Sequence, residues 1–291
     1  MEQNRDTPLP QHRSHSRNWR ENLYVYPVIS RRSGGLSIGI NLNPDMACNF
    51  DCVYCQVDRT VEPKVRDVDI EVLRVELDEM IALATSGELW QEEKFRDVPD
   101  GHRRLNDIAF SGDGEPTTCT QFKECVELVA AAKRAAKLDE VKIVLITDAC
   151  YLMRRNVVAA LVLMDNNNGE IWAKLDAGTQ DYYRKVNRPN YPLRHVVDNI
   201  IAAAMERPVV IQSLFMRVDG EPPSRMEIGE FVSRLREIAA AGGEIDRVQI
   251  YTIARRPAES FATPLSRDEL DAISQRTQQG GFKTETYEGA G

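Results

Sequence analysis

Three cysteines, Cys48, Cys52 and Cys55, lie within the eight-residue stretch CNFDCVYC, with three residues and then two between them. Thiolates are the usual ligands of iron–sulfur clusters, and a four-iron cluster normally takes four of them. Because this stretch supplies only three, a four-iron cluster bound here keeps one iron open to a ligand that is not protein. The spacing therefore predicts a [4Fe-4S] cluster with one open coordination position.

Other uses of these cysteines fit the sequence less well. A structural zinc site needs a fourth Cys or His and usually a second close pair. There is no second Cys pair at short spacing, and no histidine lies beside the motif; the four are His12, His15, His102 and His195. Three cysteines so close together cannot all pair in disulfides, which are typical of exported proteins. A chance group of buried thiols is the remaining alternative.

The composition is ordinary for a chain with a sizeable core, with 291 residues and 42% hydrophobic residues. No apolar run is long enough to cross a bilayer, and the polar first 20 residues lack the apolar stretch of an export signal. We therefore expect a cytoplasmic protein without membrane contact. The net charge of −8 argues against broad nucleic-acid binding. The first 32 residues instead carry six Arg against three acids, so this leader either touches RNA or a partner, or has no role.

The elements that must position the cysteines alternate between strands and helices. Residues 1–20 are predicted to form a disordered basic leader, and residues 21–291 one core domain with an irregular insertion at about 85–105. After an extended stretch at 23–29, strands are predicted at 36–42, 107–111, 141–147, 170–175, 209–215 and 247–252. Helices are predicted at 69–84, about 119–137, before 164, in parts of the segment before 206, at 224–240 and at 266–279. Ser266 and Glu269 are spaced as the capping box of the last helix.

This alternation is typical of parallel βαβ units with right-handed crossovers. Six such units form either an open doubly wound sheet or a partial barrel, and the spacing alone does not choose between them. In both architectures, ligands bind at the carboxyl ends of the strands. The cysteine stretch follows the first of the six strands directly, so it lies at that end.

The cysteine motif, with the aromatic Tyr54 before its last cysteine, resembles the cluster-binding signature of the radical S-adenosylmethionine (SAM) enzymes. The resemblance implies an α/β fold with a partial (β/α)6 TIM-type barrel. It also implies that SAM binds the open iron, and that an electron from a donor such as flavodoxin or ferredoxin cleaves it to methionine and a 5′-deoxyadenosyl radical. That radical abstracts hydrogen from a substrate.

Several loops after the strands extend the resemblance. The stretch SGDGEPT at 111–117 resembles the GGE-type motif that receives the amino group of SAM, where glycines allow a close backbone approach. Glu115 is the acid that fits, and Asp113 is the second candidate. Together with Tyr54, the cofactor-binding candidates are Gly112, Asp113, Gly114, Glu115, Thr147, Asp148, Thr252 and Ile253. In the family, backbone at the last two positions flanks the adenine.

Lys174 and Asp176 flank Leu175 at the end of the fourth predicted strand, so their side chains point to one side. A charged pair on an apolar strand is costly unless it is paired or wet. We therefore treat both as catalytic candidates, with a structural salt bridge as the alternative. The substrate candidates are Arg188, Gln212 and Arg217, and surface charge is the alternative role for the arginines.

The resemblance covers about 22–285, through GINLNPDMACNFDCVYCQVDRT, FSGDGEPT and KLDAGTQDYYRKVNRP. It is to a small single-cluster branch similar to the tRNA wyosine-synthesis enzymes and the activase-like radical SAM enzymes. The second cluster of the wyosine enzymes has no cysteines here, so that reaction is not carried over. Cys119, Cys125 and Cys150 are expected to be inert thiols. The acidic body favours a small-molecule or protein substrate over tRNA. A non-enzymatic iron–sulfur electron carrier or sensor is the alternative function.

Overall fold

The computed structural model describes residue 11 and residues 19–63, 65–257 and 259–289. The predicted leader lies largely outside these residues; its last two members pack on Phe95 (Trp19) and form an ion pair with Glu92 (Arg20). The chain divides into two compact units, which we describe separately. The first contains 1–47, 59–146 and 154–170, and the second contains 48–58, 147–153 and 171–291.

The first unit contains four neighbouring strands in the order β1 (Val25–Ser30), β2 (Gly35–Ile40), β3 (Leu105–Phe110) and β4 (Lys142–Thr147). β1 runs antiparallel to β2, and β2, β3 and β4 are parallel. The apolar side chains of β2 and β3 are almost all buried, as expected for parallel strands that are covered on both faces.

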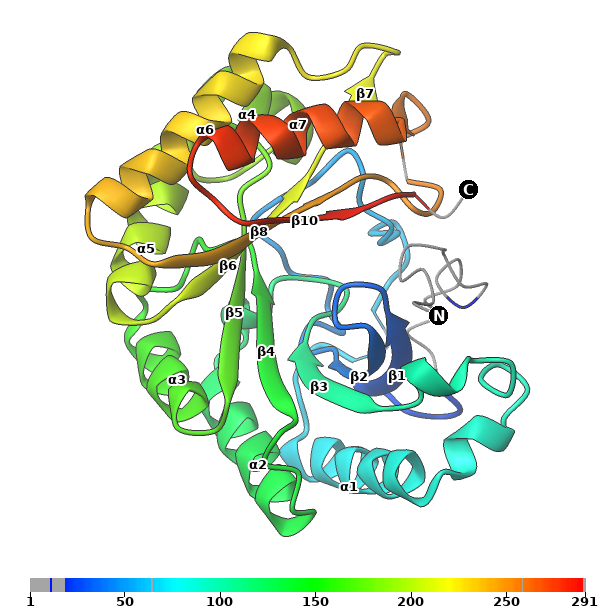
Figure 1. The fold of residues 1–291 in the computed structure, drawn as a ribbon. Coiled ribbons are helices and arrows are strands. Elements are labelled where there is room, and N and C mark those ends of the chain that lie inside the picture. Colours follow the sequence, from blue (N-terminus) through cyan, green and yellow to red (C-terminus); the bar gives the residue numbers. More distant parts are fainter. Residues whose placement is uncertain (1–10, 12–18, 64, 258, 290–291) are drawn as a thin grey trace. The chain divides into compact units, whose positions relative to one another are not determined.

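Helices α1 (Ile70–Ser86), α2 (Phe122–Ala135) and α3 (Arg155–Asp165) accompany these strands (Figure 1). α1 begins as predicted, because the Asp69 side chain accepts hydrogen bonds from two backbone N–H groups of its first turn. Its apolar face is buried through Leu73, Leu77, Met80 and Ile81. The expected insertion contains the short 3-10 helices η2 (Glu88–Gln91) and η3 (Asp100–His102), and a third, η4 (Pro116–Thr118), follows β3.

In the second unit, the parallel strands are β5 (Gly169–Lys174), β6 (Val209–Leu214), β8 (Ile245–Tyr251) and β10 (Thr284–Tyr287). Figure 1 shows α5 (Leu193–Glu206), α6 (Arg225–Ala240) and α7 (Arg267–Gln279) beside them, with the short α4 (Gln180–Asn187) after β5. The capping box of α7 is present as predicted. Among the described residues, no helix has both the length and the apolar character needed to span a membrane.

The six predicted strands correspond to β2, β3, β4, β5, β6 and β8, but the count missed β10 and the small antiparallel pair β7 (Met216–Val218) and β9 (Ala262–Pro264). β7 and β9 have only three residues each, too few for a period of two to be visible. The sequence TETY of β10 is half-buried throughout and contains no aliphatic residue. Such short or polar edge strands form because a neighbouring strand offers hydrogen-bonding groups.

Burial of Asp107 on β3 predicts a pH dependence of folding stability. Asp107 is 3% exposed and accepts a hydrogen bond from the hydroxyl of Ser37 on β2. Burial raises the pKa of its carboxyl from 3.8 to about 6. Between these values the folded state keeps a proton that the unfolded state has lost, so stability falls as pH rises through this window. At about 1.4 kcal/mol per pKa unit, the loss approaches roughly 3 kcal/mol.

We therefore expect D107N to gain stability relative to wild type as pH rises from 4 to 6.5 and to keep that advantage above it. Urea unfolding at a series of pH values measures this difference. The exposed variant D139N is the control and should follow wild type. A D107N-minus-wild-type difference that stays constant with pH would refute the prediction.

Candidate functional site

Residues 48–55, which we call the cysteine loop, belong to the second unit. Backbone hydrogen bonds hold this loop against the end of α4. The N–H of Asp51 donates to the carbonyl of Asn187 at 3.0 Å, and the N–H of Val53 donates to the carbonyl of Val186 at 3.0 Å. A turn inside the loop is closed by the N–H of Cys55 and the carbonyl of Cys52 at 2.9 Å. The end of α4 thus contributes to positioning the loop, together with the turn within it.

The three predicted ligands are reduced, half-buried thiols. Burial raises the pKa of the Cys52 thiol to about 12, against an opposing effect of the Lys174 charge. In the described part of the chain, no three His, Cys, Asp or Glu side chains are already gathered into a metal-binding arrangement. The donor set nevertheless fits an iron–sulfur cluster chemically, because three thiols share one short loop and remain partly accessible. Cys125 and Cys150 are buried, and Cys119 is half-buried.

Beside Cys52, the second unit brings together the two catalytic candidates. The ammonium of Lys174 lies 3.4 Å from the carboxylate of Asp176, whose side chain is 0% exposed. The Tyr54 hydroxyl donates to the same carboxylate, and the N–H of Leu214 donates to its other oxygen at 2.8 Å. The two side chains thus point to one side of β5, as their spacing predicted.

Two aromatic rings flank the Lys174 ammonium. It lies 5.0 Å from the ring centre of Tyr54 and 5.7 Å from that of Tyr251, and it donates to the Tyr251 hydroxyl at 3.1 Å. Burial lowers the pKa of Lys174, but the charge of Asp176 and the neighbouring Tyr251 outweigh this and raise it overall. Lys174 is therefore a cation here. The substrate candidate Gln212 is buried in the same network and accepts from the Tyr251 hydroxyl at 3.3 Å.

The loop Gly112–Glu115 belongs to the first unit and is tied to residues that follow β2. Asn41 accepts from the N–H of Asp113 at 3.1 Å and donates to its carboxylate at 2.7 Å. A methyl group on Gly112 would lie 2.2 Å from Asn41 Oδ1, and one on Gly114 would lie 2.1 Å from the carbonyl oxygen of Ala47. Both glycines are thus required by close approach of the chain itself.

Glu115 is buried and caps η4, since one of its oxygens accepts from both the N–H and the hydroxyl of Thr117, at 3.1 and 2.5 Å. Sequence analysis anticipated this acid as a ligand for SAM and did not detect its capping role. Asp113 and Glu115 thus both have contacts within the protein, which set the geometry of the loop.

The remaining cofactor-binding candidates in the second unit also make local contacts. The hydroxyl of Thr147 accepts from the N–H of Ala149, and the carboxylate of Asp148 accepts from Asn49, which lies in the cysteine loop, at 3.0 Å. The hydroxyl of Thr252 accepts from the N–H of Leu265 at 2.9 Å. Ile253 is part of an apolar cluster that also contains Val53 of the cysteine loop.

The two arginines predicted for substrate binding are paired with carboxylates of the protein. Arg188 contacts Glu259 at 2.7 Å and Asp51 at 3.5 Å. Arg217 on β7 contacts Glu269 at 2.6 Å. The carboxylate partners lie far from the arginines in the sequence. The residue types alone therefore did not reveal these ion pairs.

Sequence analysis missed three residues that organise these sites: Asn41, Asn187 and Tyr251. Asn187 donates to Asp176 at 2.8 Å and to Cys52 Sγ at 3.4 Å. A usable signal was present, because Asn41 and Tyr251 lie at the carboxyl ends of strands, where ligands bind.

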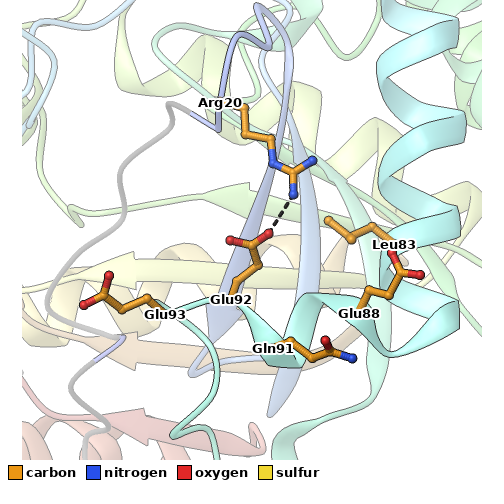
Figure 2. A pocket seen from close by; sticks show the side chains of 6 residues that line it. All are labelled: Arg20, Leu83, Glu88, Gln91, Glu92 and Glu93. Carbon is orange, nitrogen blue, oxygen red and sulfur yellow. Dashed lines mark hydrogen bonds and ion pairs between the residues drawn. The ribbon is translucent and has the colours of Figure 1, made fainter.

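A separate surface pocket lies beside the end of α1 and contains none of the predicted site residues. Figure 2 shows Arg20 reaching Glu92 across it, with other polar side chains around the rim. Its lining consists of Arg20, Leu83, Glu88, Gln91, Glu92 and Glu93. None of these residues carries a thiol, so the pocket is not a candidate for the chemistry of the cysteine loop.

Gly178, in the loop that follows Asp176, is packed so closely that we expect its substitution to lower the stability of the protein. Glu227 accepts from the N–H of Gly178 at 2.5 Å, and a methyl group there would lie 2.0 Å from the backbone nitrogen of Phe231. We expect G178A to destabilise the protein by about 1–3 kcal/mol through overpacking. The control G229A lies in α6 with open space around it and should be neutral or slightly stabilising. Equal urea midpoints for the two variants would contradict this account.

Comparisons with known proteins give weak sequence similarity. No protein-family model matches the chain. A GTPase Obg from Brachyspira hyodysenteriae is 23% identical over 84% of this chain and 32% of its own. UPF0026 proteins from Methanocaldococcus jannaschii and Helicobacter pylori are 29% and 23% identical, over 60% and 86% of this chain and 46% and 73% of theirs. The chain spans less than half of the first two of these relatives.

Solved structures give a clearer likeness. A radical SAM methyltransferase from Sphaerobacter thermophilus matches 92% of this chain and 70% of its own, with a TM-score of 0.63 and 14% identity. SuiB from Streptococcus suis, solved with S-adenosylmethionine bound, matches 89% of this chain and 49% of its own, with a TM-score of 0.56 and 12% identity. The chain therefore has the fold of the radical SAM enzymes, and the predicted α/β partial (β/α)6 barrel is confirmed.

Proposed function

We propose that this protein is a radical SAM enzyme that binds one [4Fe-4S] cluster through Cys48, Cys52 and Cys55. The observation that carries the proposal is a loop with three thiols on a chain with the radical SAM fold. When bound, a cluster with one iron open to SAM supplies the electron that breaks a sulfur–carbon bond of SAM, giving methionine and a 5′-deoxyadenosyl radical. Flavodoxin or ferredoxin is the class of donor proposed for that electron.

The chain's own residues would bind and orient SAM. In this proposal the Gly112–Glu115 loop receives the amino group, with the acid Glu115 as its partner and Asp113 as the second candidate. Thr147 ends β4 and Asp148 follows it; both are proposed to serve the ribose or carboxylate, and backbone at 252–253 to flank the adenine. The contacts of Asn41 and Thr117 within that loop support its role, because a preorganised loop loses little entropy on binding.

Lys174 and Asp176 are proposed to face the substrate. The pair holds one cation and one anion in fixed positions beside Cys52, and Tyr54 contacts both. A polar substrate group would therefore meet a preorganised donor and acceptor rather than water. The net charge of −8 favours a small-molecule or protein substrate over tRNA.

A non-enzymatic iron–sulfur carrier or sensor is the second candidate. Three thiols on the loop, rather than four, argue against it, because a carrier gains nothing from an open iron. The GTPase in one relative's name has no counterpart in this sequence, which contains no G-x-x-x-x-G-K-[ST] phosphate-binding stretch.

Removal of a loop cysteine tests the cluster. After anaerobic reconstitution, we expect wild type to bind iron and sulfide and to release 5′-deoxyadenosine when given dithionite and SAM. C48A, C52A and C55A should each lose the cluster and this activity, because two thiols cannot replace three ligands. C119A lies outside the loop and should keep both. Wild-type protein that loads a cluster but leaves SAM intact would favour the carrier, and loading of all three loop variants would refute the assigned ligands.

The affinity for SAM tests the proposed role of the loop of residues 112–115, the glycine–acid loop. E115Q keeps the oxygen that accepts from Thr117 and loses the charge offered to the amino group. Since hydrogen bonds to charged groups contribute about 1.5–3 kcal/mol, the Kd for SAM should rise about 10- to 100-fold. E88Q, in the pocket of Figure 2, is the matched control with unchanged affinity. Calorimetry on cluster-loaded protein measures this, and equal Kd values for E115Q and wild type would exclude Glu115 as the partner.

A further inference from the structure

The side chain of Asn187 lies between a predicted cluster ligand and the buried ion pair. Asn187 is the last residue of α4 and is 1% exposed. Its Nδ2 atom lies 2.8 Å from Asp176 Oδ2, 3.4 Å from Cys52 Sγ and 3.3 Å from the Tyr54 hydroxyl. An amide nitrogen carries two hydrogens. One is directed at Asp176 by the shortest contact, and the other is within reach of both Cys52 Sγ and the Tyr54 hydroxyl.

The orientation of this amide is fixed by its surroundings. A carboxylate paired with a lysine only accepts hydrogen bonds, so the nitrogen and not the oxygen of Asn187 must face Asp176. Among the described residues, Asn187 Oδ1 has no hydrogen-bond donor, although it is buried. A buried polar atom without a partner is costly.

The backbone of the same residue holds the cysteine loop, because the Asn187 carbonyl accepts from the N–H of Asp51 at 3.0 Å. The Asn187 backbone thus holds the loop close to the Asn187 side chain. The contact between Nδ2 and Cys52 Sγ is made by a buried side chain rather than a mobile surface one. Hydrogen bonds to cluster-ligating sulfurs are one of the factors that set reduction potentials. They stabilise the reduced cluster most, because it carries one more negative charge.

We propose that Asn187 is a positioning residue that donates an N–H···S hydrogen bond to the Cys52 thiolate and raises the reduction potential of the bound cluster. The inference rests on the proposed function, since it requires a cluster on the cysteine loop. It extends that function by linking cluster potential to the Lys174–Asp176 pair, because Asp176 orients the amide. A change in the charge of that pair on substrate binding would reach the cluster through one side chain.

A redox titration of the reconstituted full-length protein, followed by the electron paramagnetic resonance of the reduced cluster, tests the proposal. We expect N187A to shift the midpoint potential to a more negative value than wild type. Y54F removes a neighbouring hydroxyl bond to Asp176 but keeps the N–H···S contact, so its shift should be smaller. N199A removes another buried asparagine of the same unit, which donates to Ala149 and Cys150 carbonyls, and should cause no shift.

A second measurement needs no variant. Wild-type protein labelled with ¹⁵N only in asparagine side-chain amides should show hyperfine coupling between this nitrogen and the reduced cluster. Absence of that coupling, or equal potentials for N187A and wild type with full clusters, overturns the inference and leaves the proposed function intact. Wild-type protein that binds no cluster overturns both.

Discussion

The buried carboxylate of Asp176 is the interaction on which the site in the second unit depends. Removing an ion from water costs several kcal/mol unless its lone pairs are satisfied. Here the partners come from three further segments: the N–H of Leu214 at the end of β6, Asn187 at the end of α4 and Tyr54 in the cysteine loop. Lys174 supplies the counter-charge. These contacts share the carboxylate among them, so it links the cysteine loop to the ends of β5, β6 and α4.

Local pattern made part of this arrangement predictable. Lys174 and Asp176 are two apart on a strand, and a period of two places them on one face. The helix starts at Asp69 and Ser266 follow from capping chemistry, which acts within three residues. The position of the cysteines after a strand was likewise visible. In each case the information lies within a few residues of the feature that it determines.

The partners of those residues could not be predicted in the same way. Asn187 and Cys52 are in contact although they are 135 residues apart in the sequence, and Arg217 and Glu269 are 52 residues apart. No local pattern encodes such a pairing, because it depends on how strands and helices pack. Residue type therefore leaves both substrate binding and surface charge open for Arg217, and it points to no role for Asn187. Strand β10 was missed for a related reason, since its register comes from β8 and not from its own side chains.

The loop of residues 112–115 meets a constraint from the chain itself, beside the ligand contact that is proposed for it. From the sequence, Gly112 and Gly114 are interpreted as allowing a ligand to approach closely. In the structure, Asn41 and Ala47 fill the space where a side chain at these positions would lie. These residues belong to the chain segment that leads from β2 to the cysteines. The loop is therefore shaped before any ligand arrives, and Asn41 holds both the N–H and the carboxylate of Asp113.

The buried pair of Lys174 and Asp176 needs an explanation other than stability. Replacing a buried ion pair by hydrophobic residues is often neutral or stabilising, so stability alone does not account for Lys174 and Asp176. What the pair provides is position: the Lys174 ammonium is held between two aromatic rings and by the Tyr251 hydroxyl, and the carboxylate orients an amide toward Cys52. In the proposed enzyme, such preorganised charges would act on a reaction without reorganising during it. The geometry that makes burial of Asp176 tolerable would then also serve the proposed chemistry.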